Sequence, residues 1–299
     1  MSSFADRMKE YPTISLDRFD RENLHARAYF LSHCHKDHMK GLKGPLLKRK
    51  LKFSCTAHLS QRSNPKYAFW EDHIVSIILK DVVVTLLPAG HCPGSVMFLF
   101  EGAQGTVLYT GDFRLAVGDA ARMEYLHSGD RVKDIQSVYS DTTFFDPKYH
   151  QIPSREACLT GISQLVQDWI CQSPYHVVWL NCKAAYGYEY LFTNLGQEFS
   201  SQVRAWICKK NMPEILCHMT TDRATQIHAC RSSSGQTGYR VKYHREGYSS
   251  YDTPYTMLVK DFLSYICPVN IYPNVIPLGK TLEDVAELLK PLYKIKCKY

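Results

Sequence analysis

The sequence lacks a long apolar run and a regular spacing of cysteines. Its longest apolar stretches, residues 82–87 and 96–100, have the length of a strand, whereas crossing a bilayer takes about 20 apolar residues. We therefore expect no membrane association. The first twelve residues, MSSFADRMKEYP, contain no apolar segment, so we expect no secretory signal. The eleven cysteines are odd in number and scattered, which favours reduced thiols over a disulfide scaffold.

The composition is that of a soluble globular protein, without internal repeats. The chain has 299 residues, of which 45% are hydrophobic and 22% charged, enough to bury the cores of one or two domains. The net charge of +7 is moderate, but part of it is clustered in one short run: Lys40, Lys43, Lys48, Arg49, Lys50 and Lys52. Such a run suits a polyanionic partner, although a solvated surface loop would have the same composition.

The densest chemical signal is a histidine motif that directly follows the apolar residues 28–31. Its members are His33, His35, Asp37 and His38. At the end of a strand, histidines at positions i and i+2 point to the same side of the chain. The Asp-His pair that follows can then offer ligands to a second, adjacent position. The plainer alternative is a histidine-rich surface loop that binds nothing.

Two more candidate ligands follow predicted strands, each in a turn that contains glycine. They are His91, within the segment 88–95, and Asp112, which follows Gly111. Alone, each has a simpler explanation, as a core histidine or a turn aspartate. Together with the histidine motif they suit zinc, because imidazole and carboxylate are ligands that borderline metals prefer. One coherent arrangement has two metal positions and a bridging carboxylate: His33, His35 and His91 at the first, Asp37 and His38 at the second, and Asp112 between them.

The second half of the chain alternates between strand and helix patterns. We expect strands at 135–139 and 175–180, and helices at 153–171 and 184–199. This alternation predicts βα units and a parallel sheet. A helical period recurs at 255–266 and 281–290. The whole sequence therefore predicts an α/β protein.

Several of these motifs together resemble one known family. The segment 33–38 is similar to the HxHxDH signature of the metallo-β-lactamase fold, and His91 and Asp112 resemble its next two metal motifs. Asp17 matches the acidic residue of an early strand in that fold. Segments 85–100 and 108–114 resemble the DNA cross-link repair nucleases of the β-CASP group. The resemblance implies a metallo-β-lactamase αββα sandwich built from residues 1–131 and 252–299, with a shortened β-CASP domain inserted at 132–251.

The resemblance also implies roles for individual carboxylates. Asp37 would orient the attacking hydroxide besides binding a metal. Asp141 matches the first β-CASP motif, and Asp17 and Asp141 would act as carboxylates that fix the tautomers of the metal-binding imidazoles. Zinc would lower the pKa of its bound water from about 15.7 to near 7. A phosphodiester is the substrate that the basic run favours, with Lys36 and the run from Lys40 to Lys52 binding phosphates.

The chain departs from the family at two metal positions. The third β-CASP motif carries a histidine that helps to hold the second metal, but the corresponding place here, residues 251–255, contains none; Asp252 is the candidate substitute. His228 and Cys230 match two of four ligands of a structural zinc site in the β-CASP domain, and Arg204 falls near the third. We expect this structural site to be empty. We therefore expect one zinc ion at the first catalytic position, with Mg²⁺ or Mn²⁺ as alternative metals for activity.

The function that the resemblance implies is a metal-dependent, structure-selective DNA endonuclease. It would open hairpins and trim overhangs and single-strand–double-strand junctions, with 5′–3′ exonuclease action. This would place the chain in the nucleus, in non-homologous end joining and V(D)J recombination. The implied partners are the DNA-dependent protein kinase catalytic subunit and DNA ligase IV, and we expect a monomer. Three alternatives stay open: a catalytically impaired DNA-binding homologue, an RNA-cleaving β-CASP nuclease, and a hydrolase of small thioesters or lactams.

Overall fold

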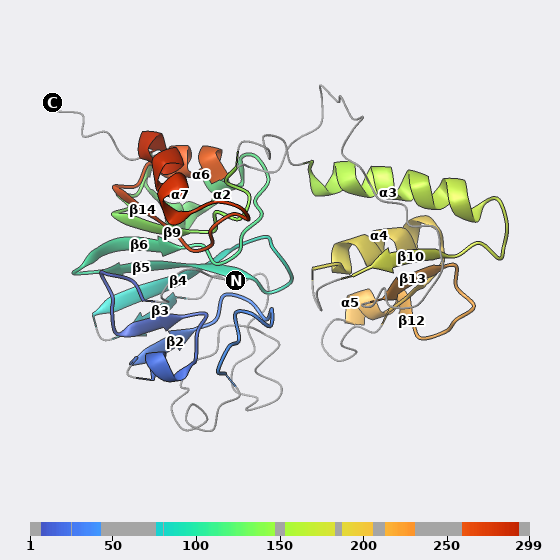
Figure 1. The fold of residues 1–299 in the computed structure, drawn as a ribbon, viewed down its shortest axis with the longest axis horizontal. Helices are drawn as coiled ribbons and strands as arrows, with labels where there is room; N and C mark the ends of the chain where they lie inside the picture. The colour runs from blue at the N-terminus through green and yellow to red at the C-terminus, as the bar shows by residue number, and fades with distance from the viewer. Residues whose placement is uncertain are drawn as a thin grey trace. The chain divides into compact units, whose positions relative to one another are not determined.

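The chain divides into two compact units in a computed structural model. The structure describes residues 7–24, 26–42, 76–79, 81–146, 153–182, 187–205, 213–230 and 259–292. Unit 1 combines Met1–Ile152 with Thr256–Tyr299, and unit 2 is Pro153–Tyr255. Unit 2 is therefore inserted into unit 1 along the sequence (Figure 1).

Unit 1 is built on a six-stranded mixed sheet. Its strand order is β14-β9-β6-β5-β4-β3, with these bounds: β3 Ser76–Leu79, β4 Val82–Pro88, β5 Val96–Gly102, β6 Gly105–Tyr109, β9 Ser137–Ser140 and β14 Asn270–Pro273. The neighbours from β3 to β6 are antiparallel, whereas β6, β9 and β14 are parallel. Strands β5 and β6 form a hairpin, with Gly102 opposite Gly105 at its turn.

Both faces of this sheet are buried, each in a different core. Successive side chains of a strand point to opposite faces, so Leu99 of β5 packs in one core while Phe98 and Phe100 pack in the other. The core around Leu99 also contains side chains of helices on that face: α2 (Asp119–Arg122), α6 (Val259–Ile266) and α7 (Leu282–Leu289). The other core contains the short parallel strands β1 (Ile14–Leu16) and β2 (Ala28–Phe30). The sequence thus forms a helix layer, a sheet and a second, smaller sheet.

Short elements complete unit 1. They are η1 (Arg21–Asn23), η2 (Glu124–Leu126), η4 (Lys290–Leu292) and the two-stranded sheet of β7 (His127–Ser128) and β8 (Arg131–Val132). Nowhere in the described residues is there a helix long and apolar enough to cross a bilayer.

The boundary between the units lies later than the sequence pattern suggests. The expected boundary at 131/132 assigns the strand near residue 135 to the inserted domain. In the structure this strand, β9, pairs with β6 on one side and with β14 on the other, so it belongs to unit 1. Unit 1 continues to Ile152, and it resumes at Thr256 rather than at 252. The pairing partner β14 lies about 130 residues further along the chain, which no local pattern reveals.

Unit 2 is a parallel sheet with two long helices, as the alternating pattern predicts. Its strand order is β10-β13-β11-β12, with bounds β10 Val178–Asn181, β11 Val203–Arg204, β12 Met219–Thr220 and β13 Ile227–Cys230. The helices are α3 (Arg155–Ile170), α4 (Glu189–Glu198) and the short α5 (Pro213–Leu216). Ser154 is the N-cap of α3, because its hydroxyl accepts from the amide of Ala157 at 3.1 Å. Residues of α3, α4 and the sheet share one core, which includes Val166, Phe192 and Ile227.

Candidate metal centre

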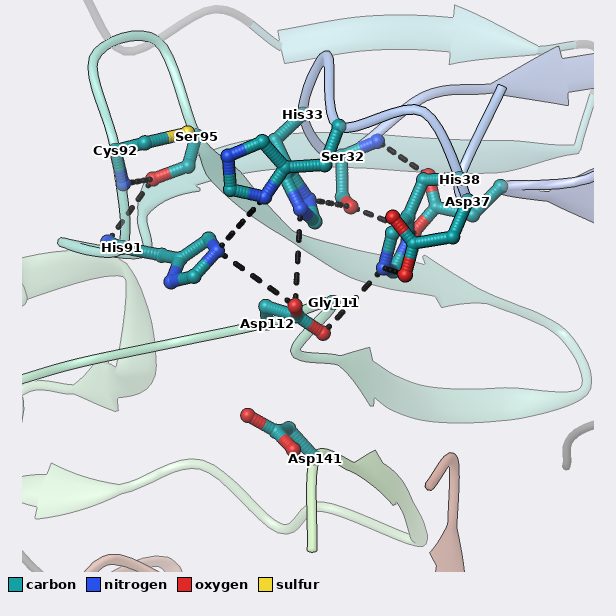
Figure 2. Close-up of polar contacts among 12 residues, drawn as sticks. Ser32, His33, Asp37, His38, His91, Cys92, Ser95, Gly111, Asp112 and Asp141 are labelled. Carbon is teal, nitrogen blue, oxygen red and sulfur yellow. Dashed lines mark hydrogen bonds and ion pairs between the residues drawn. The ribbon is translucent and has the colours of Figure 1, made fainter. Parts of the chain in front are cut away.

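The candidate ligands lie in three loops of unit 1, each following a strand of the two sheets. The histidine motif follows β2, His91 follows β4, and Asp112 follows β6. Figure 2 shows the three loops converging on Asp112, with the imidazoles on one side of its carboxylate. Residues that are up to 79 positions apart in the sequence therefore share one site, as the strand-end pattern predicts.

Two glycines allow the loops to approach this closely. Gly90 has φ +66, and a Cβ placed there would lie 2.2 Å from the carbonyl oxygen of Arg114. Gly111 has φ +52, and its Cβ would lie 2.6 Å from both Cβ and Oγ of Ser32. Any larger residue would be both strained in the left-handed region and too close to a neighbour. The loops that carry His91 and Asp112 thus depend on glycine beside each ligand.

The first predicted metal position is present as a compact group of donor atoms. His33, His35, His91 and Asp112 each offer one atom within 4.8 Å of the others. Asp112 Oδ2 lies 3.7 Å from His33 Nε2 and 3.6 Å from His91 Nε2. His91 Nε2 is 3.2 Å from His35 Nδ1. Three nitrogens and one oxygen at this spacing are a donor set that suits zinc.

His33 carries the clearest sign that this group is built for a ligand. The residue is fully buried, and its Nε2 has no hydrogen-bond partner among the described residues. Buried polar atoms are almost always paired, since leaving one unpaired costs about 1–3 kcal/mol. Because Nε2 faces Asp112 at a distance too long for a hydrogen bond, a metal ion bound between them would pair it. The residues present therefore fit a transition metal.

The second predicted position lies on the other side of Asp112. Asp112 Oδ1 is 3.5 Å from His38 Nε2, and Asp37 Oδ2 is 3.8 Å from the same nitrogen. The two oxygens of Asp112 thus face different groups: Oδ2 faces His33 and His91, and Oδ1 faces His38 (Figure 2). The bridging role that the sequence predicts for Asp112 would require such a placement. Asp37 lies on the solvent-exposed side of the group, and its side chain is 55% exposed.

Asp17 supports the site from beneath by accepting four hydrogen bonds. Its Oδ1 accepts from the backbone amide of Ser32 at 2.6 Å, and its Oδ2 accepts from Ser32 Oγ at 2.6 Å, from Tyr109 Oη at 2.9 Å and from His38 Nδ1 at 2.9 Å. Asp17 itself has φ +54, an uncommon conformation for a residue other than glycine. The contact with His38 is the imidazole-orienting role that the sequence assigns to Asp17. With these four donors, Asp17 holds ligands in place rather than binding metal itself.

Burial and charge shift the pKa values of the site. Burial lowers the pKa of His33 to about 3 and that of His91 to about 4, so both imidazoles are neutral at pH 7 and can bind a metal. Burial opposes protonation of His38 too, but the carboxylates of Asp17 and Asp112 outweigh it and raise the pKa of His38 to about 11. The pKa values of Asp17 and Asp112 are lowered despite burial, chiefly by His38. In the absence of metal, His38 is therefore the cation that balances the two buried carboxylates.

Asp141 differs from its predicted role. Its carboxylate, 1% exposed, accepts from Arg114 Nη1 at 2.9 Å and from the backbone and hydroxyl of Thr143 at 2.9 and 2.5 Å. Among the described residues, no histidine donates to it. The side chain lies beyond Asp112 in Figure 2, on the side away from the imidazoles. Its direct partner is thus a guanidinium, and it holds the loop after β6 through Arg114 rather than fixing an imidazole tautomer.

The predicted DNA-binding residues are only partly described. Lys36 and Lys40 are exposed, on the same segment as the histidine motif. Five further candidates lie outside the described residues: Lys43, Lys48, Arg49, Lys50 and Lys52. The candidate second-metal ligand, Asp252, also lies outside them.

The candidate structural zinc site in unit 2 is described only in part. His228, on β13, is 5% exposed, and its Nε2 lies 2.6 Å from the carbonyl oxygen of Thr225. Arg204 of β11 is its register partner in the sheet, and the Arg204 Nε is buried without a hydrogen-bond partner. Arginine is not a zinc ligand, so Arg204 does not supply the third donor, whereas His228 Nδ1 is buried without a hydrogen-bond partner among the described residues. Cys230 ends the same strand, and nothing is described of its side chain.

Two residues of the centre were not found from the sequence: Ser32 and Tyr109. Both contact Asp17 through their hydroxyls. Ser32 directly precedes the histidine motif, and Tyr109 ends the strand before Asp112, so their positions next to motif residues were the available signal. Ser32 lies 15 positions from Asp17 in the sequence, and Tyr109 lies 92 positions from it. Only the fold shows that both residues contact Asp17.

The chain is similar to curated relatives over nearly all of its length. The protein artemis of Danio rerio is 66% identical over 363 aligned positions, which cover 99% of this chain and 57% of that protein. The protein artemis of Homo sapiens is 54% identical, over 98% of this chain and 52% of that protein. The chain is artemis-like. It spans about half the length of these artemis relatives, and the 363 aligned positions exceed its 299 residues, so the artemis of Danio rerio has residues without a counterpart here.

Other comparisons are more distant. The 5′ exonuclease Apollo of Gallus gallus is 38% identical over 185 residues, which cover 60% of this chain and 37% of that protein. No protein-family model matches the chain. Among solved structures, a protein of unknown function from Enterococcus faecalis matches with a TM-score of 0.39, at 15% identity, over 70% of this chain and 52% of that one. At that TM-score the likeness carries no argument about fold. The artemis likeness therefore comes from the sequence, and the site's chemistry comes from its own geometry.

Proposed function

We propose that the chain is the catalytic part of a metal-dependent DNA nuclease with a metallo-β-lactamase fold and an inserted β-CASP domain. The likeness to artemis and Apollo proteins supports a nuclease. The mixed sheet with helices on one face and a second sheet on the other, and an inserted parallel α/β unit, are compatible with that fold.

The two-sided placement of Asp112 is the observation that carries the proposal. One oxygen faces His33 and His91, and the other faces His38, which in turn lies near Asp37. We infer zinc at the three-histidine position, because imidazole-rich donor sets favour it. A metal bound there supplies Lewis acidity toward a phosphoryl oxygen and activates water at neutral pH. The support for a metal ion at the second position is weaker, because its remaining ligand would have to come from outside the described residues.

The protein's own side chains would orient the reactants. Asp37 is exposed beside the buried histidines, so its carboxylate can accept a hydrogen bond from the attacking water and hold it in line with the phosphorus. Lys36 and Lys40, exposed on the same segment, would bind the phosphates on either side without reading bases.

The likeness to artemis also narrows the proposed substrates and setting. We infer cleavage of DNA hairpins, overhangs and single-strand–double-strand junctions, with 5′–3′ exonuclease action, in end joining and V(D)J recombination. Nuclear localisation and association with the DNA-dependent protein kinase catalytic subunit and DNA ligase IV belong to the same proposal.

Cleavage of an end-labelled DNA hairpin by the zinc-loaded protein and its Asp37→Asn variant tests this function. We expect metal-dependent cleavage that falls by at least about 100-fold in the variant, because the amide cannot accept a proton as the carboxylate does. Asp130→Asn, an exposed aspartate between β7 and β8, is the matched control and should cleave like the wild type. Equal activity of wild type and Asp37→Asn would refute the mechanism. Zinc binding without cleavage of DNA or RNA would instead indicate a catalytically impaired DNA-binding homologue.

A further inference from the structure

Ser32 connects two of the groups at the metal centre. Its hydroxyl oxygen lies 2.6 Å from Asp17 Oδ2 and 3.0 Å from His33 Nδ1, and the residue is 1% exposed. Neither contact partner is adjacent to solvent: Asp17 is 3% exposed and His33 is fully buried. The hydroxyl is therefore shared between a buried carboxylate and a buried imidazole.

Counting protons settles which group donates in each contact. A hydroxyl has one hydrogen, and an ionised carboxylate can only accept. Both oxygens of Asp17 already accept from other donors, Oδ1 from the backbone amide of Ser32 and Oδ2 from Tyr109 Oη and His38 Nδ1, so this carboxylate has no hydrogen of its own to donate. The Ser32 hydrogen therefore points to Asp17, which is also the shorter contact. Ser32 Oγ then has only lone pairs to offer to His33, so the hydrogen in that contact belongs to His33 Nδ1.

The opposite arrangement is unfavourable on both sides. If Ser32 donated to His33 Nδ1, two oxygens with facing lone pairs would lie 2.6 Å apart between Ser32 and Asp17. The imidazole proton would then be on Nε2, whose nearest acceptor, Asp112 Oδ2, is 3.7 Å away and too far for a hydrogen bond. That Nε2 has no partner in the structure agrees with a lone pair there rather than a proton.

We propose that Ser32 is a positioning residue that sets the tautomer of His33, protonated at Nδ1 and free at Nε2 for a metal ion. Since His38 Nδ1 contacts the same Asp17 oxygen directly, one carboxylate prepares one imidazole at each metal position: His38 by direct contact and His33 through the serine. This role rests on the proposed metal centre, but not on the reaction that the centre performs.

The test compares Ser32→Ala with Ser137→Ala in the full chain. Ser137 is a suitable control because it is also fully buried and also donates its hydroxyl to a carboxylate, that of Glu10, with no imidazole in contact. The first readout is the ¹⁵N chemical shifts of the His33 ring in metal-free protein, which distinguish the two neutral tautomers. The second is zinc affinity, measured by competition with a chromophoric chelator.

We expect wild type and Ser137→Ala to show His33 protonated at Nδ1, and Ser32→Ala to populate the Nε2-protonated form. Zinc affinity should fall by roughly 10–100-fold in Ser32→Ala, the usual effect of removing a group that orients a metal-binding histidine, and should not change in Ser137→Ala. Ser32→Cys keeps the volume but bonds weakly, and its zinc affinity should lie between those of wild type and Ser32→Ala; this variant replaces Ser32→Ala should the latter fail to fold.

An unchanged His33 tautomer together with zinc affinity within twofold of wild type in Ser32→Ala would overturn the proposal. The proposed function can fail separately. A wild-type protein that cleaves neither DNA nor RNA, yet shows the tautomer change and the weaker zinc binding of Ser32→Ala, would refute the nuclease and leave the role of Ser32 intact.

Discussion

Replacing Gly111 by alanine should damage the metal centre through a contact that can be calculated from the backbone alone. Gly111 has φ +52, and the added methyl would lie 2.6 Å from both Cβ and Oγ of Ser32. A residue other than glycine costs about 1–2 kcal/mol in this conformation, and forcing a methyl into a packed site adds about 1–3 kcal/mol. The free energy of unfolding should therefore fall by about 2–5 kcal/mol.

Gly129→Ala separates the two contributions. Gly129 has a similar φ of +62, but in the described part of the chain no heavy atom outside its two neighbours lies within 4 Å of its added Cβ. Its substitution should cost only the conformational share, about 1–2 kcal/mol. Urea titration followed by circular dichroism gives the unfolding free energies, and chelator competition gives zinc affinity. Zinc affinity should fall in Gly111→Ala alone, because only there is Ser32 displaced.

If Gly111→Ala lowers the unfolding free energy no more than Gly129→Ala does, the contact between the added methyl and Ser32 contributes nothing to the loss of stability. The same conclusion follows if Gly111→Ala keeps wild-type zinc affinity. Either result would show that the loop after β6 relaxes around the methyl without moving the serine.

Two further predictions concern protons at the same site. Metal-free protein should lose stability as the pH falls from about 6 to 4, because unfolded His33 and His91 bind protons below about 6.5 while the folded protein holds their pKa values near 3 and 4; each contributes up to about 1.4 kcal/mol per pH unit. Urea titrations at several pH values should show a shallower slope for His91→Gln, and an unchanged slope would contradict the assignment. Tyr109→Phe removes one of the hydrogen bonds to buried Asp17 and should lower the unfolding free energy by about 1.5–3 kcal/mol; the exposed Tyr125→Phe should have no effect, and equal effects would count against a role for the Tyr109 hydroxyl.

The ligand set could be predicted from sequence because each member follows a strand or lies within a short motif. His33, His35 and His38 are neighbours along the chain, and glycine-containing turns mark His91 and Asp112. Strand ends at the same edge of a sheet lie close together in space. The number of residues between these motifs therefore did not affect the prediction. The bridging placement of Asp112 followed from the same logic.

What could not be predicted depends on side-chain direction and on distant pairing. Asp141 follows its strand as Asp112 does, yet its carboxylate binds Arg114, and nothing in the local sequence indicates that direction. The hydroxyl of Ser32 acquires its role only because Asp17, in a left-handed backbone conformation, turns its carboxylate toward it. The boundary between the units was placed too early because β9 looks like the start of a βα unit until its partner β14 is known.

The pairing of β9 with β14 has a consequence for synthesis of the chain. Ribosomes add roughly 5–20 residues per second, so β9 emerges on the order of ten seconds before the strand that will cover its edge. All of unit 2 is synthesised during that interval, whereas the sheet of unit 1 has an open edge and lacks the core side chains of α6 and α7 until they are made. An open strand edge readily pairs with other chains. The nascent protein is thus most prone to aggregation late in translation, and protection by a chaperone would matter most while residues 141–269 are being made.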